Sequence, residues 1–183
     1  VQTQWILLRE RGPLAVLRNR GLRRARAPIV CFCDDDLVAS RGYLQRVLVA
    51  LAQPGIIGVS GPSIIPGCYR DNRELYKHAY LRILYDFAFV TPERRPGHVS
   101  PGGTFVPDPD WSYEGPVQFL EACHMAFKTD AIQAVGGFDE AYGGVGDWSE
   151  PDLAFRLRRR FGERSLWFDP QLAVEHRCSP GGA

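Results

Sequence analysis

The sequence lacks the features that mark membrane-spanning, disulfide-stapled and disordered chains. No apolar run approaches the ~20 residues that cross a bilayer, and residues 47–52 are among the longest. No signal-peptide pattern is present. The five cysteines are odd in number and scattered, without a CxxC pair, which argues against a disulfide framework or a zinc knuckle and favours a reducing, cytoplasmic compartment. With 45% hydrophobic and 23% charged residues, the 183-residue chain is expected to form a single soluble globular domain.

Net charge is also nearly absent, because 22 basic residues face 21 acidic ones. A formal charge of +1 excludes a global field that would hold the protein on nucleic acid or on a membrane. The distribution is nevertheless uneven: every basic residue except Lys77 and Lys128 is an arginine, and residues 9–26 contain seven arginines against one acid, Glu10. We interpret this run as the solvated face of a helix or as a local patch for an anionic partner.

Short apolar segments alternate with helical patterns in the first part of the chain. Residues 6–8, 29–33 and 56–59 are typical of buried strands. Pro13 is suited to open one helix and Ser40 to cap another, at residues 43–51. The alternation predicts an α/β layer with parallel strands. The predicted buried faces are Leu14, Leu17, Leu22 and Ala25 in the first helix, whose arginines point outward, and Leu44, Val47, Leu48 and Leu51 in the second.

Longer loops separate the elements of the second part. A helix is expected at residues 72–90, and the six prolines and four glycines of residues 91–116 predict a long loop that serves as a lid or binding segment. Thr129 or Asp130 can cap a short helix to residue 135, which Gly136 and Gly137 end. After a glycine-rich loop at 138–148, Ser149 is expected to cap a helix that begins with Pro151 and runs to residue 161, and strands follow at 166–168 and 172–174.

An acidic triplet, Asp34, Asp35 and Asp36, directly follows the predicted strand at 29–33. The carboxyl ends of parallel strands are where open α/β sheets bind ligands. Adjacent carboxylates repel one another, and a divalent cation such as Mg²⁺ or Mn²⁺ would relieve that repulsion. Because alternate residues of an extended segment face the same side, Asp34 and Asp36 could reach one ion while Asp35 points elsewhere. The alternative is a solvated acidic turn before the helix.

Other candidate groups lie near the end of the chain. Glu150 and Asp152 fall at the start of a predicted helix, where carboxylates stabilise the first turn, but Glu150 follows a loop ending in Trp148 and could serve as a general base. His176 follows the terminal strand and is either a structural residue or a metal ligand. His124, within an apolar run, is ambiguous.

Several of these segments, taken in order, resemble a family 2 glycosyltransferase of the GT-A fold. They are Arg18-Asn19-Arg20-Gly21-Leu22, the triplet at 34–36, Gly136-Gly137-Phe138-Asp139-Glu140, the segment 150–157 and the strand that ends at His176. The resemblance covers nearly the whole chain. It implies a Rossmann-like, mostly parallel sheet flanked by helices, with residues 1–60 forming the nucleotide-sugar-binding part and residues 117–183 the acceptor and catalytic part of a domain spanning 1–183.

The resemblance also implies roles for single residues. The donor would be a nucleotide-diphosphate sugar, with Mg²⁺ or Mn²⁺ held by Asp34, Asp36 and His176. Asp35 or Asp34 would bind the ribose, Asn19 would lie beside the nucleotide, and Gly136, Gly137 and Trp148 would line the sugar site. Glu150, or else Asp152, would deprotonate a hydroxyl of a carbohydrate or lipid-linked acceptor, with inversion at the anomeric carbon. Arg18 or Arg20 could meet diphosphate, and the arginine-rich helix could contact the inner face of a membrane during cell-surface polysaccharide synthesis.

The sequence departs from the family pattern at three places. The strand and helix that usually begin the fold do not precede Val1, so the sequence is expected to be a truncated piece, inactive if part of its nucleotide site is missing. Ser149-Glu150 stands where the family has Glu-Asp, and Cys123-His124 where it has a small residue and asparagine. The remaining alternatives are a retaining enzyme or nucleotidyltransferase of the same fold, and a noncatalytic module that binds a sugar nucleotide or a partner.

Overall fold

A computed structural model describes residues 12–64, 95–99, 110–143 and 148–177. The strand expected at 6–8, the helix at 72–90 and most of the loop at 91–116 lie outside these residues. The helices are α1 (Leu14–Leu22), α2 (Tyr43–Ala52), α4 (Thr129–Ala134) and α5 (Ser149–Phe161). The strands are β1 (Ile29–Cys33), β2 (Leu37–Ala39), β3 (Gly58–Ser60), β4 (Ser63–Ile64), β5 (Gly115–Pro116), β6 (His124–Lys128), β7 (Leu166–Phe168) and β8 (Val174–His176). None of these helices is long and apolar enough to cross a bilayer.

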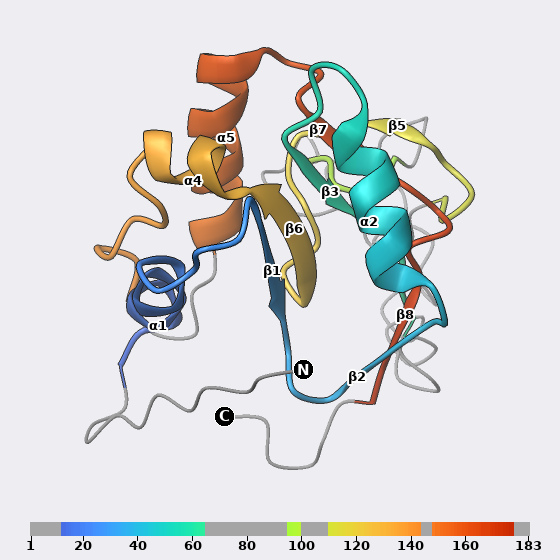
Figure 1. Cartoon of the computed structure of the whole chain (residues 1–183), viewed down its shortest axis with the longest axis horizontal. Helices are drawn as coiled ribbons and strands as arrows, with labels where there is room; N and C mark the ends of the chain where they lie inside the picture. The colour runs from blue at the N-terminus through green and yellow to red at the C-terminus, as the bar shows by residue number, and fades with distance from the viewer. Residues whose placement is uncertain (1–11, 65–94, 100–109, 144–147, 178–183) are drawn as a thin grey trace, which may run out of the picture.

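The main sheet has five strands in the order β1-β6-β3-β7-β5 (Figure 1). Strands β1 and β3 run in the same direction, as predicted, since both pair antiparallel with β6. Only β3 and β7 are parallel neighbours, and β5 is antiparallel to β7. The expectation of a mostly parallel sheet was therefore wrong for the described residues. Strand β6 lies between β1 and β3 and runs antiparallel to both. An apolar strand sequence does not reveal this direction, because both faces of the strand are buried whichever way it runs.

A second sheet of three strands, β2-β8-β4, lies beyond the carboxyl end of β1. Strand β8 is antiparallel to β2 and parallel to β4. Leu37 pairs with His176 and Ala39 with Val174. The predicted strand at 172–174 is thus shifted toward the carboxyl terminus, and that shift brings His176 to the edge where β1 ends.

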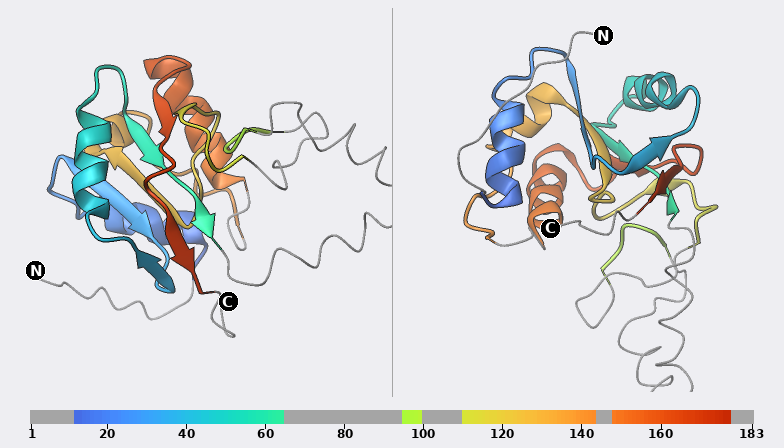
Figure 2. Two further views of the ribbon diagram at one scale, coloured as in Figure 1. Left: turned by 90° about the vertical axis from the view of Figure 1, so that its right-hand side faces the viewer. Right: turned by 90° about the horizontal axis from the view of Figure 1, so that it is seen from below.

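Helices cover both faces of the main sheet. Figure 2, in the view from below, shows α1 and α5 on one side and α2 on the other. Strand β6 contributes alternate residues to the two cores: Met125 and Phe127 pack with the α1, α4 and α5 side, whereas Ala126 packs with the α2 side. This alternation follows from the two-residue period of a strand. Coverage of both faces explains the continuous apolar character of β3 and β6. The buried strand predicted at 29–33 was wrong in its burial, because β1 lies at the edge of the described sheet and its residues are half-buried or, at Cys33, exposed.

The buried faces of α1 and α2 differ from the predicted ones. In α1 the buried residues are Ala15, Arg18, Asn19 and Leu22, so the outward orientation predicted for the arginines is wrong for Arg18. In α2 the buried residues are Tyr43, Val47, Ala50 and Leu51, while Leu44 and Leu48 are 65% and 50% exposed. The rotation of α2 buries Tyr43, whose hydroxyl bonds to Nδ1 of His124 at 3.1 Å. Helical spacing alone does not decide which of two adjacent apolar stripes on a helix faces the core.

Backbone conformation at the helix ends also corrects the predicted caps. Gly42, with φ of 86°, occupies the N-cap of α2 instead of Ser40. Trp148, with φ of 73°, occupies that of α5, so Ser149 is already helical. Lys128 precedes α4, and neither Thr129 nor Asp130 caps it. The predicted stop after α4 is confirmed: Gly136 and Gly137 have φ of 83° and 75°, values that glycine adopts without a side-chain penalty.

Candidate metal and catalytic site

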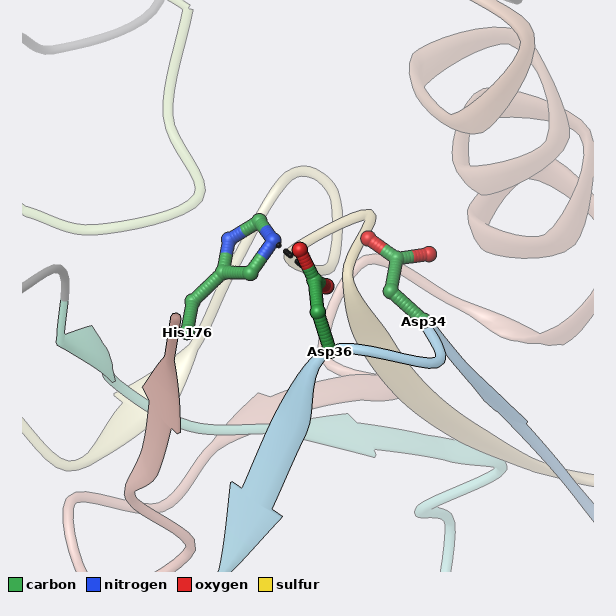
Figure 3. Close-up of side chains that lie close together, drawn as sticks. All are labelled: Asp34, Asp36 and His176. Atoms are coloured by element: carbon green, nitrogen blue, oxygen red, sulfur yellow. Dashed lines mark ion pairs between the residues drawn. The ribbon is translucent and has the colours of Figure 1, made fainter. Parts of the chain in front are cut away.

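Three potential metal ligands meet where β1 ends. Asp34, Asp36 and His176 each offer one ligand atom, and these atoms all lie within 4.8 Å of one another. Nε2 of His176 is 3.0 Å from Oδ1 of Asp36. Figure 3 shows the three side chains directed toward the same region from the end of β1, the start of β2 and the end of β8. The metal set predicted from the sequence is thus brought together.

The backbone explains this meeting. The N–H of Asp34 donates to the carbonyl of Cys123 at 2.9 Å, which ties the end of β1 to the segment before β6. The N–H of Arg177 donates to the carbonyl of Asp36 at 3.0 Å and extends the β2–β8 pairing. Asp35 is exposed and is not one of the three clustered ligands, consistent with alternation along an extended segment.

The local electrostatics suit a cation. Burial is the largest influence on Asp34 and raises its pKa; Asp36 and Asp35 raise it further, while Arg18 and His176 act in the opposite direction. A bound cation would offset the repulsion among the three carboxylates and would stabilise the ionised form of Asp34. Ligands ~2.1 Å from an octahedral Mg²⁺ lie about 3 to 4 Å apart, so two carboxylate oxygens and one imidazole nitrogen within 4.8 Å fit such an ion after small adjustments.

Glu150 lies in the first turn of α5, facing the protein interior. Its carboxylate Oε1 is ion-paired with Nη1 of Arg18 from α1, and the two side chains are only 9% and 7% exposed. The other terminal nitrogen of Arg18, Nη2, donates to the carbonyl of Ala122 at 3.1 Å. This buried pair joins residues 132 positions apart and was not anticipated from the sequence. A signal existed, since helical spacing puts Arg18 on the same face as Ala15 and Leu22.

Asp152 has a different environment. Its Oδ2 accepts hydrogen bonds from Nε and Nη2 of Arg156 at 2.9 and 2.7 Å. Nη1 of Arg156 in turn donates to the carbonyls of Val135 and Gly137 at 2.7 and 2.8 Å. Asp152 therefore anchors an arginine that holds the turn after α4.

Asn19 and the glycine turn form one unit. The side-chain nitrogen of Asn19 donates to the carbonyl of Phe138 at 2.8 Å and to Oε1 of Glu140 at 2.9 Å. Its oxygen accepts from the N–H of Phe138 at 2.9 Å. The bond from Asn19 is the largest influence lowering the pKa of Glu140. A Cβ at Gly137 would lie 2.5 Å from Oδ1 of Asn19, so the glycine permits this contact. Gly136 is exposed beside it.

Further groups near the site were missed or left open by the sequence. His124 is fully buried next to Tyr43, and removal from solvent lowers its pKa to about 4. Burial raises the pKa of Glu121 to about 7. The backbone N–H of Glu121 donates to Oγ of Ser60 at 3.2 Å. Trp148, 41% exposed, borders the α5 end of the site. Isolated acids and histidines in apolar runs carry no sequence signal that separates these environments.

Solved structures share the fold. The mannosyltransferase PcManGT from Pyrobaculum calidifontis, in complex with GDP-Man and Mn²⁺, superimposes with a TM-score of 0.57 and 18% identity over 95% of this chain and 39% of its own. GalNAc-T7 with UDP, GalNAc and Mn²⁺ gives a TM-score of 0.61 and 9% identity over 93% of this chain and 31% of its own. These likenesses confirm the α/β GT-A architecture.

Sequence relatives agree with the fold. The pre-mycofactocin glycosyltransferase of Mycobacterium tuberculosis, from strains CDC 1551 and H37Rv, is 27% identical over 166 residues, or 91% of this chain. The chain spans 30% of the length of these relatives. The family model for glycosyl transferase family 2 matches residues 5–107, which is more than half of the 183 residues and includes the acidic triplet. This match identifies the chain as a member of glycosyl transferase family 2.

Proposed function

We propose that the protein transfers a sugar from a nucleotide-diphosphate sugar to an acceptor hydroxyl, with Mg²⁺ or Mn²⁺ held by Asp34, Asp36 and His176. The observation that carries the proposal is the grouping of these three ligands at the carboxyl edge of β1 in a family 2 chain. Both structural neighbours bind Mn²⁺ and a nucleotide, which supports a divalent cation and a nucleotide sugar as the molecules bound by this protein. A cation at this position would stabilise the charge that develops on the leaving nucleoside diphosphate.

Glu150 is the proposed general base. In the transfer step the acceptor oxygen bonds to the anomeric carbon, the bond from that carbon to the diphosphate oxygen breaks, and the hydroxyl proton passes to the Glu150 carboxylate. Attack from the face opposite the leaving group inverts the anomeric configuration. In each of the two acids an arginine occupies one carboxylate oxygen, Arg18 in Glu150 and Arg156 in Asp152. We favour Glu150 because it directly follows the loop that ends at Trp148.

The other candidate residues surround these groups. Asp35, exposed next to the ligand cluster, is suited to bind the ribose. Asn19, Gly136 and Gly137 shape the turn that would border the sugar, and the exposed ring of Trp148 at the N-cap of α5 would also line the sugar site. We assign residues 1–60 to donor binding and residues 117–183 to acceptor binding and catalysis; the loop at 91–116 would contribute a lid. The proposed acceptor is a carbohydrate or a lipid-linked carbohydrate.

Donor binding tests the metal assignment. Calorimetry of the full-length protein with a panel of nucleotide sugars, with and without Mn²⁺, is expected to reveal one Mn²⁺-dependent donor. Asp36→Ala should abolish that binding. The matched control is Asp130→Asn, which changes an exposed carboxylate of α4 at the opposite end of β1. Undiminished Mn²⁺-dependent binding by Asp36→Ala would refute the metal assignment.

Product analysis tests the reaction. Glu150→Gln should keep donor affinity and lose transfer, and the anomeric configuration of the wild-type product should be inverted relative to the donor. Transfer at a near wild-type rate by Glu150→Gln would move the base to Asp152. A retained configuration, release of pyrophosphate, or donor binding without turnover would instead support a retaining enzyme, a nucleotidyltransferase or a noncatalytic module.

Membrane contact is a separate proposal. Arg20, Arg23, Arg24 and Arg26 are exposed on and after α1 and could rest on anionic lipid at the cytoplasmic face of a membrane. Sedimentation with phosphatidylglycerol vesicles should fall when these four are replaced by glutamine. Equal sedimentation of both proteins would leave the arginines as a solvated helix face.

A further inference from the structure

Arg18 is a buried cation between the two acidic parts of the site. Its side chain is 7% exposed, and its Cζ lies 5.2 Å from the centroid of the Phe138 ring. A guanidinium removed from water requires partners for its charge and its N–H groups. Nη1 meets that need at Glu150, and Nη2 meets it at the carbonyl of Ala122.

The contact to Ala122 links Arg18 to the metal ligands. The next residue, Cys123, accepts the backbone N–H of Asp34 at 2.9 Å through its carbonyl. One side chain of α1 therefore contacts the proposed base directly and reaches the residue after β1 through two consecutive residues, Ala122 and Cys123.

We propose that Arg18 is a positioning residue that holds the carboxylate of Glu150 and the segment 122–123 at a fixed separation. The inference rests on the proposed function, since it takes Glu150 as the base. A planar guanidinium can direct two N–H groups at two fixed acceptors, which the compact ammonium of lysine does less well. Orientation of a reacting group contributes strongly to rate, so displacement of Glu150 should slow transfer without weakening donor binding.

The geometry disfavours the other role considered for Arg18, contact with the donor diphosphate. Both terminal nitrogens bond to the protein and one face of the guanidinium lies over Phe138. Arg159, in the last turn of α5, is exposed and has no role in the proposed site. It provides a control arginine.

The experiment compares Arg18→Lys, Arg18→Met and Arg159→Met in the full-length protein. With the donor identified by calorimetry, Arg18→Met should lower kcat by about 100-fold while the donor Kd changes less than about threefold. Arg18→Lys should recover part of kcat, and Arg159→Met should change neither quantity. Arg18→Met combined with Glu150→Gln should be no slower than Glu150→Gln alone, because the arginine acts through the glutamate. A donor Kd that rises in proportion to the loss in kcat would overturn the proposal in favour of diphosphate contact.

Thermal unfolding separates this inference from the proposed function. The midpoint shifts of Arg18→Met and Glu150→Gln should be strongly non-additive in the double variant, since either change leaves the other partner buried without its ion pair. Additive shifts would overturn the Arg18–Glu150 coupling whether or not the protein transfers sugar. Non-additive shifts in a protein that transfers no sugar would refute the proposed function while supporting the pair. If Arg18→Met does not fold, Arg18→Lys carries the same comparison.

Discussion

Acidification should destabilise this fold through His124. This side chain lies on β6 and is completely buried beside Tyr43 of α2. Desolvation lowers its pKa from 6.5 to about 4. The unfolded chain therefore binds a proton between pH 6.5 and 4 that the folded protein does not. The stability contributed by neutral His124 is fully present above pH 6.5 and is lost as the pH falls toward 4.

The magnitude follows from the size of the shift. The difference between 6.5 and about 4 corresponds to ~3 kcal/mol of unfolding free energy across this window. Carboxyl groups with raised pKa values, Glu121 and Asp34, act with the opposite sign in the same region, so the wild-type profile alone is not decisive. The comparison of wild type with His124→Gln removes their contribution, because both proteins carry them.

Urea unfolding between pH 4 and 7.5 provides the assay. His124→Gln keeps a polar group that can bond to the Tyr43 hydroxyl but binds no proton, so its stability relative to wild type should improve by ~3 kcal/mol from pH 7 to pH 4. A constant stability difference between His124→Gln and wild type at all pH values would refute the burial of a neutral His124.

Three other changes probe the remaining contacts. Glu121→Gln should stabilise the protein by up to ~3 kcal/mol at pH 8 and by little at pH 4. The reason is that a carboxyl whose pKa rises from 4.5 to about 7 on folding favours the unfolded state once the pH exceeds 4.5. Urea unfolding at both pH values measures the effect, and equal stabilisation at both would contradict the prediction. Gly137→Ala should lower the free energy of unfolding by ~1–3 kcal/mol, because φ is 75° and the new Cβ would lie 2.5 Å from Oδ1 of Asn19. Gly136→Ala, with φ of 83° and open space around it, measures the backbone cost alone. Equal melting temperatures for the two variants would argue against the Asn19 contact. Asp152→Asn should lower the free energy of unfolding by ~1 kcal/mol, because it weakens the ion pair with Arg156, but it should leave most transfer activity. A loss of transfer as large as that of Glu150→Gln would identify Asp152 as the base.

The arrangement of α1 gives the family resemblance a physical basis. Asn19 binds the turn that contains Phe138, and its neighbour Arg18 binds Glu150 at the start of α5. Two adjacent residues thus connect α1 to two later segments of the chain that lie more than 100 residues away. Substitution of either leaves buried polar groups without partners, which accounts for the joint appearance of these motifs in one sequence.

Much of the local structure followed from the sequence. Apolar runs identified β1, β3 and β7, and paired glycines marked the end of α4, because burial and backbone freedom are properties of the residues themselves. The position of Asp34 directly after β1 also followed from the order of residues. Asp34 and Asp36 were predicted as candidate metal ligands on this basis, and the structure brings them together with His176.

The sequence by itself determined the helices α1, α2, α4 and α5, the strands β1, β3 and β7, and which carboxylates follow them, since these depend on neighbouring residues. It did not indicate β2, β4, β5 or β6. Only the tertiary structure decided that β6 runs backwards between β1 and β3, that β8 carries His176 to Asp36, and that Arg18 meets Glu150 across 132 positions. Strand direction and long-range pairing depend on how the cores on both faces are filled. The same apolar pattern satisfies several such arrangements, and packing selects one of them.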